Sequence, residues 1–374
     1  MNCAPLTTQV FNDLIAALTE IRDGYVLSED RFREPLDVVE GYRYVGQVLS
    51  AASELFFEAD PEHPRLAPIV SPARKLQGDN PDAIYHYARI SGDHSYRIYG
   101  TREHECYTSF TIHGASPDGA MAGALLGDVN DRDLHIEHDG TYTIVLSAHE
   151  HPGNWIRLDE AAHSVVVRSY FQLPQSAQND GNIRVRIGIE PLNPAASAPP
   201  LSDEVLANRM RAGVAFLRQV TLGQGLPAAT SPVPFVSNVA NTLPTPFSFR
   251  DSGLPVPGAA DIHYSMGRWE LAEDQALVMT GTLPTCAFVN VMLWNRHMQT
   301  LDYSTRQSSL NQAQVELEPD GSYRIVIAHH NPGVANWLDT EGHVTGSIFW
   351  RYLLAEQDPP ISHCAVVALA ELRH

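Results

Sequence analysis

Residues 328–351 read AHHNPGVANWLDTEGHVTGSIFWR and form the richer of two copies of one pattern. The other copy, AHEHPGNWIRLDEAAHSVVVR, occupies residues 148–168. We call residues 148–168 the first copy and residues 328–351 the second copy. DGTYTIVLS precedes the first copy and DGSYRIVI precedes the second. A strand, a Pro-Gly turn, an Asn-Trp pair and another strand therefore follow in the same order in both. The chain therefore contains an internal duplication, and the fold of one copy predicts the fold of the other.

The short apolar runs around these copies indicate a mainly β protein. They lie between residues 83 and 189 and again between residues 261 and 372, separated by Gly, Asp and Pro turns, with strands expected at 134–137 and 314–317 among them. An Asp-Gly pair at 139–140 and another at 320–321 suit tight hairpins. This pattern is typical of a sandwich or jelly roll, and we expect two related jelly-roll-like β-sandwich halves.

Helices are expected outside the two halves. Apolar residues recur at helical spacing over residues 8–21, and a second helix begins near Pro35, a residue suited to a first helical turn. Ser202 can cap a third helix, with acidic residues in its first turn. The predicted organisation is an N-terminal helical pair (1–60), a first sandwich half (79–190), a linker helix with an extended arm (191–257) and a second half (258–374).

Composition and charge exclude several classes of partner. The 374 residues are 44% apolar and 18% charged, which is ordinary for a folded protein of two domains or two halves. The net charge is −19 without a basic stripe, so neither nucleic acid nor an anionic membrane surface is an expected partner. The four cysteines show no CxxC spacing and the N-terminus does not resemble a signal peptide, which favours reduced thiols in the cytoplasm, with a Cys106–Cys286 contact left open.

Four segments carry a resemblance to a bacterial family known as domain of unknown function 1214, which is related to domain of unknown function 1254. They are NPDAIY (80–85), DGTYTIVLS followed by GNW (139–155), WNRHMQTLDY (294–303) and HHNPGVANWLDTEGH (329–343). The resemblance runs from about residue 79 onward and implies a jelly-roll-like sandwich, but no established reaction. Asn331 departs from the family's pattern, in which an acidic residue is expected before the Pro-Gly turn.

The second copy holds the main candidate site. His329 within reach of Asp339 could act as an oriented general base, and Arg351 could hold a carboxylate, sulfate or phosphate. The Asn336-Trp337 pair, Thr340 and His343 complete the expected substrate contacts. The alternative is structural, because Pro-Gly-x-x-Asn-Trp also makes a turn in which Trp337 fills the end of the sandwich and polar side chains satisfy loop amides. The first copy shares the Pro-Gly and Asn-Trp elements, so His329, Asp339, Thr340 and His343 carry the functional signal.

A second cluster precedes this loop in the sequence. Trp294 offers an aromatic floor, and Asp302, Tyr303 and Arg306 offer polar contacts for a hydroxylated ligand. Asp302 and Asp339 could also converge as a pair of carboxylates, as in glycoside hydrolysis. The structural alternative is a loop in which Trp294 packs and Asp302 pairs with Arg306. Asp82, in Asn80-Pro81-Asp82, more often belongs to a turn and strand entry than to a catalytic centre.

We expect no metal or cofactor, with a zinc or iron site at His149 and His151 left open as an alternative. His149-x-His151 places two imidazoles on one face of a strand, but no third ligand follows at a recognised spacing. The serine-hydrolase elbow, the phosphate-binding loop and the dinucleotide fingerprint are all missing from the sequence. We therefore expect a protein that acts on a hydroxylated organic small molecule by hydrolase or lyase chemistry, with His329, Asp339, Asp302 and Tyr303 as catalytic residues. The alternative is a non-catalytic lectin-like or capsid-like binding or assembly module, and a homo-oligomer is left open.

Overall fold

The computed structural model describes residues 4–32, 34–116, 121–194, 200–224, 231–250 and 261–372. The chain forms two compact units, of which the first comprises Met1–Leu76, Ile84–Ser169 and Asn182–Leu226. The second comprises Gln77–Ala83, Tyr170–Gly181 and Pro227–His374. Parts of the arm expected over residues 191–257, namely 195–199, 225–230 and 251–257, lie outside the described residues. The expected class is confirmed, because the described chain is mainly β with a few helices.

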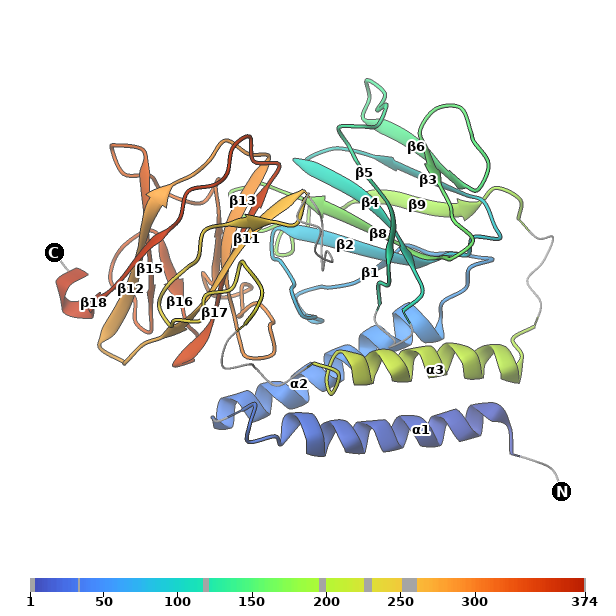
Figure 1. Cartoon of the computed structure of the whole chain (residues 1–374), viewed down its shortest axis with the longest axis horizontal. Coiled ribbons are helices and arrows are strands. Elements are labelled where there is room, and N and C mark those ends of the chain that lie inside the picture. The colour runs from blue at the N-terminus through green and yellow to red at the C-terminus, as the bar shows by residue number, and fades with distance from the viewer. Residues whose placement is uncertain are drawn as a thin grey trace. The chain divides into compact units, whose positions relative to one another are not determined.

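The helices of the first unit pack together beside its sheets (Figure 1). They are α1 (Leu6–Ile21), continued by η1 (Arg22–Val26), α2 (Pro35–Ala52), continued by η2 (Ser53–Phe57), and α3 (Asp203–Gln219). The Ser202 hydroxyl caps α3 as expected, accepting a hydrogen bond from the Val205 N–H at 3.2 Å. Asp203 also caps α1, because its carboxylate accepts the N–H groups of Leu6 and Thr7 at 2.7 and 3.0 Å. None of the helices in the described residues is long and apolar enough to cross a membrane.

Two sheets make up the rest of the first unit (Figure 1). One has the strand order β1-β2-β8-β4-β5 and the other β7-β6-β3-β9. Their strands are β1 (Ala67–Pro68), β2 (Ala83–Arg89), β3 (Tyr96–Thr101), β4 (Tyr107–Gly114), β5 (Leu125–Asn130), β6 (Thr141–Ser147), β7 (Trp155–Arg157), β8 (Ala162–Tyr170) and β9 (Arg186–Pro191).

The second unit repeats this topology strand for strand. Its sheets have the orders β10-β11-β17-β13-β14 and β16-β15-β12-β18. Each label is nine higher than its counterpart, and in both units the short strand after the Pro-Gly turn pairs in parallel with the strand before it. The strands are β10 (Phe247–Ser248), β11 (Ile262–Glu270), β12 (Gln275–Thr282), β13 (Phe288–Trp294), β14 (Ser309–Asn311), β15 (Ser322–Ala328), β16 (Trp337–Asp339), β17 (Thr345–Leu353) and β18 (His363–Ala368), followed by η3 (Leu369–Leu372). The internal duplication is therefore a duplication of the whole fold.

Large aromatic side chains fill the core of the second unit. Trp350 stacks on Tyr352 with ring centroids 5.5 Å apart and packs against Tyr323 at 5.3 Å. All three come from strand faces that are directed between the two sheets, where alternate residues of β15 and β17 meet. The opposite face of β17 presents Phe349 and Arg351, and this face carries much of the candidate site.

The predictions of strands at residues 134–137 and 314–317 are wrong, because the described chain has no strand over either range. The strands β5 and β14 end before these ranges begin. The backbone N–H groups of His135 and Glu316 donate to asparagine side chains rather than to a neighbouring strand. The expected turns after them are present, with Gly140 at φ 83° and Gly321 at φ 85°. Both glycines have left-handed backbone geometry, which a side chain would strain.

Candidate functional site

The Asn-Trp pair of the second copy is bound to the protein's own backbone. The side-chain amide of Asn336 accepts the Glu316 N–H at 2.9 Å and donates to the Glu316 and Arg324 carbonyls at 2.7 and 3.1 Å. The Trp337 indole N–H donates to the Ala328 carbonyl at 3.0 Å. These bonds fix the turn between β15 and β16.

The first copy makes the same contacts. Asn154 accepts the His135 N–H at 2.8 Å and donates to the His135 and Thr143 carbonyls at 2.8 and 3.0 Å. The Trp155 indole donates to the Ser147 carbonyl at 3.1 Å. Because both copies use the pair identically, the geometry matches the structural interpretation of Asn336 and Trp337. Their role as substrate contacts stays a prediction.

His329 lies at the end of β15 with both ring nitrogens engaged. Nδ1 lies 2.7 Å from the Thr340 hydroxyl and Nε2 lies 3.1 Å from the Leu271 carbonyl. A carbonyl can only accept, so Nε2 carries a proton, and in the neutral ring Nδ1 accepts from Thr340. Thr340 is fully buried. The structure thus gives His329 a hydroxyl partner and leaves neither nitrogen directed to a ligand.

Asp339, the last residue of the short strand β16, pairs with Arg306. Its Oδ2 accepts from Arg306 Nη1 at 2.7 Å, and its Oδ1 accepts the Glu341 N–H at 2.8 Å. The hydrogen bond and charge of Asp339 raise the pKa of Arg306. His329 contacts Thr340, the residue after Asp339, whereas Asp339 contacts Arg306. The expected His–Asp pair is therefore divided into a His329–Thr340 pair and an Arg306–Asp339 pair.

Asp302 belongs to the same charged group but has a turn-forming role. Its carboxylate accepts the Ser304 N–H at 2.9 Å and the Thr305 hydroxyl at 2.7 Å. Its own N–H donates to Glu341 Oε2 at 2.7 Å. Glu341, which the sequence pattern does not single out, adopts a positive φ of 55° and ties this turn to β16. Arg306 lies among the three carboxylates of Asp302, Asp339 and Glu341.

Tyr303 and His343 are both buried beside these turns. Tyr303 is 5% exposed, and burial raises the pKa of its phenol, with the negative charge of Asp79 adding to the effect. His343 donates from Nδ1 to the Thr340 carbonyl at 2.9 Å. Both side chains are thereby placed within the protein rather than on an open surface.

Trp294 and Arg351 form the part of the site on the outer face of β13 and β17. Trp294 stacks on Phe349 with centroids 4.2 Å apart, and its indole N–H donates to the Thr300 hydroxyl at 3.1 Å. The Arg351 guanidinium carbon lies 4.8 Å from the Phe349 ring centroid, and its Nη2 donates to the Gly78 carbonyl at 2.6 Å. Trp294 is 1% and Arg351 6% exposed, so the segment from Gly78 covers the expected aromatic floor.

Sequence reasoning missed the buried amides that hold this segment. Asp82 is fully buried and accepts from Nδ2 of Asn290 at 3.0 Å and of Asn311 at 2.9 Å. Burial raises the pKa of Asp82, while these hydrogen bonds and the Arg351 charge act in the opposite direction. The sequence did contain a signal for these buried amides. Asn290 lies inside the strand sequence FVNVMLW and Asn311 inside SLN, and a polar side chain in a buried strand needs a hydrogen-bond partner.

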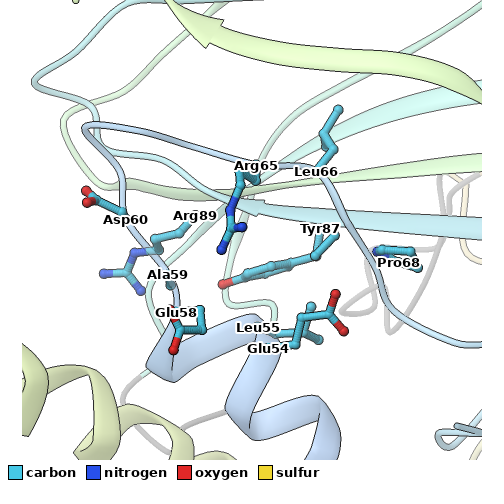
Figure 2. A pocket seen from close by; sticks show the side chains of 11 residues that line it. Glu54, Leu55, Glu58, Ala59, Asp60, Arg65, Leu66, Pro68, Tyr87 and Arg89 are labelled. Carbon is cyan, nitrogen blue, oxygen red and sulfur yellow. The ribbon is translucent and has the colours of Figure 1, made fainter.

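A cavity of about 280 Å³ lies in the first unit, between η2 and β2 (Figure 2). Sequence reasoning missed it because its lining comes from the irregular connection after residue 57 together with alternate residues of β2. Figure 2 shows Arg65, Arg89 and Glu58 around the hydroxyl end of the Tyr87 ring. An arginine and a tyrosine two residues apart on a strand, and so on one face, were the only signal.

The charges around this cavity are only partly neutralised. Glu54 pairs with Arg74, and Asp60 pairs with Arg209 at 3.1 Å. The side chains of Glu58 and Arg65 are exposed and make no hydrogen bond or ion pair with any described residue. One carboxylate and one guanidinium are thus available to a ligand.

Arg89 adds a second guanidinium without a carboxylate partner among the described residues. It contacts Nε2 of His163. Burial and the Arg89 charge lower the pKa of His163 to about 4, so that ring is neutral at neutral pH. Burial also lowers the pKa of Arg89, but a guanidinium stays protonated. The cavity therefore has an unneutralised positive side.

Metal-binding geometry is not found in the described part of the chain. There, no three His, Cys, Asp or Glu side chains are grouped to hold an ion. His149 and His151 lie in the exposed turn after β6, where His151 Nδ1 contacts the Pro152 carbonyl at 3.0 Å.

Comparison with known proteins identifies a family and a close structural relative. The family model described as "Protein of unknown function (DUF1214)" matches residues 86–175 and 268–357, one match in each repeat. An uncharacterised protein from Burkholderia cenocepacia is 32% identical, covers 98% of both chains and has a TM-score of 0.82. The VPA0106 protein from Vibrio parahaemolyticus is 13% identical, over 86% of this chain and 97% of its own, with a TM-score of 0.46. No curated protein gives a significant match.

Proposed function

Since the chain belongs to the DUF1214 family, whose description assigns no activity, we propose from its geometry that it is a non-catalytic, jelly-roll-like binding module. In this proposal it holds a small polar organic molecule in the first-unit cavity and works in the cytoplasm, without a nucleic-acid or membrane partner. The three described cysteines Cys106, Cys286 and Cys364 are free thiols, which is compatible with that location.

One contrast carries the proposal. In the second copy both nitrogens of His329 and both carboxylate oxygens of Asp339 have partners within the protein. A general base needs a nitrogen or oxygen within hydrogen-bond reach of a substrate proton. In the first-unit cavity the charged groups of Arg65 and Glu58 have no such partner among the described residues.

The enzyme hypothesis stays as a second proposal because of the ion pair between Arg306 and Asp339. The Arg306 side chain is 46% exposed while it binds Asp339, so a ligand could approach that carboxylate from the Arg306 side. Hydrolase or lyase chemistry would then use Asp339 with Asp302 and Tyr303, which lie close to Arg306 in sequence.

Thermal-shift screening combined with product analysis separates the two proposals. Sugars, terpenoids, steroids, sulfate esters and small charged metabolites would be tested with the full chain, and each compound that raises Tm would be recovered and examined by mass spectrometry. We expect bound compounds to be recovered unchanged, with Tm shifts that persist in His329→Ala and Asp339→Asn. Turnover that is lost in either variant would overturn the binding proposal and support the enzyme.

A further inference from the structure

Within the described part of the chain, the first-unit cavity combines two cations without a carboxylate partner, one anion without a cationic partner, and an apolar wall. The cations are Arg65 and Arg89 and the anion is Glu58. Leu55, Leu66 and the ring of Tyr87 supply the apolar part of the lining. Figure 2 shows the Arg65 guanidinium next to the hydroxyl end of Tyr87, with Arg89 and Glu58 toward the same end of the ring.

Tyr87 gives a second observation at the same place. The residue is 2% exposed, and its hydroxyl lies beside the Ser164 side chain. The charges of Arg65, Arg89 and Glu58 beside it suit a polar ligand rather than an apolar one.

We propose, resting on the binding function above, that this cavity takes a small zwitterion, namely an α-amino acid with an apolar side chain. Its carboxylate binds Arg65 and Arg89, its ammonium binds Glu58, and its side chain packs on Leu55, Leu66 and the Tyr87 ring. A simple anion would leave Glu58 unpaired and a simple amine would leave both guanidiniums unpaired, so neither matches the charges as well.

Size supports the same class of ligand. The volume of about 280 Å³ lies just below the range of about 300–1,000 Å³ that is usual for ligand pockets. A single amino acid is a ligand of this size. The cavity is therefore matched to a ligand of metabolite size.

Calorimetric titration of the full chain with L-leucine and L-phenylalanine tests the inference. The matched probes are 3-phenylpropionate, which lacks the ammonium group, and phenethylamine, which lacks the carboxylate. We expect both amino acids to bind and each incomplete probe to bind at least about tenfold more weakly, because each loses a charge-assisted hydrogen bond. L-glutamate tests whether a second carboxylate is accepted, and binding of L-glutamate alone would overturn the apolar side-chain preference.

Two exposed positions allow variants that should fold. Arg65→Gln and Glu58→Gln should each weaken phenylalanine binding by at least about tenfold. Glu58→Gln should also reduce the difference in affinity between phenylalanine and 3-phenylpropionate, because only phenylalanine has an ammonium group for Glu58 to bind. A loss of folding alone would weaken the binding of both probes equally. Arg157→Gln and Glu160→Gln remove exposed charges elsewhere in the same unit and should leave binding unchanged.

The outcomes separate this inference from the binding function itself. If neither amino acid binds, or if both variants bind them as the wild type does, the zwitterion assignment is overturned. If a compound of another class binds and Arg65→Gln weakens it, the ligand class is wrong and the proposed binding function stands. If no compound shows sensitivity to either variant, both proposals fail.

Discussion

His329 and Thr340 form a 2.7 Å contact between the imidazole Nδ1 and the hydroxyl, which links the end of β15 to the residue after β16. The Leu271 carbonyl takes the other nitrogen at 3.1 Å. The histidine therefore bridges three segments of the second unit, and removing it should affect stability before it affects any chemistry.

A double-mutant cycle measures the His329–Thr340 contact. His329→Ala and Thr340→Val should each lower the free energy of unfolding, because each leaves a polar partner without its hydrogen bond. The double variant should lose less than the sum, with a coupling of roughly 1 kcal/mol from denaturant titration. Strict additivity would show that the contact contributes nothing.

Asn336→Ala should destabilise the protein more than Asn154→Ala. Asn336 is 6% exposed and satisfies three backbone groups, so its loss should cost about 2 kcal/mol. Asn154 makes equivalent bonds but is more exposed, so water can replace them at a cost nearer about 1 kcal/mol. Thermal denaturation of both variants checks the order, and equal or reversed costs would contradict it.

Asp82 should make stability depend on pH in an unusual direction for an aspartate. Burial raises its pKa in the folded state, so the folded chain holds the proton more tightly than the unfolded chain. The contribution of Asp82 to the free energy of unfolding is thus largest below about pH 4 and falls as pH rises through the raised pKa.

Asp82→Asn removes that titration and supplies the comparison. The free energy of unfolding of the wild type minus that of Asp82→Asn should decrease between about pH 4 and about pH 7. Urea titrations at several pH values measure it. An increase over the same window would mean that Asn290, Asn311 and Arg351 stabilise the anion more than burial opposes it.

The described thiols should react slowly in the folded protein. Burial raises the pKa of Cys106 to about 12 and of Cys286 and Cys364 to about 11. Only the thiolate is nucleophilic, so alkylation by iodoacetamide near pH 8 should be at least about 100-fold slower than for free cysteine. Peptide mass spectrometry measures the rates, with the urea-unfolded chain as control. Fast modification of any of the three in the folded chain would contradict the burial effect.

The sequence by itself determined what repeats and what is local. Two copies of strand, Pro-Gly turn, Asn-Trp pair and strand predicted two related β halves, and the structure shows the same strand order in both. The Ser202 cap and the left-handed glycines at 140 and 321 follow from preferences that act over a few residues. Such features depend on neighbours along the chain, and so the sequence displays them directly.

Only the tertiary structure decided the partners of the reactive side chains. His329 meets a carbonyl 58 residues away, and Asp82 meets Asn290 at a separation of 208 residues. His329 contacts Thr340 while Asp339 pairs with Arg306, so the expected catalytic pair is divided. The cavity near Tyr87 is likewise assembled from an irregular connection and a strand. Hydrogen-bond partners and cavities arise from contacts between distant segments, and one sequence does not specify their distances.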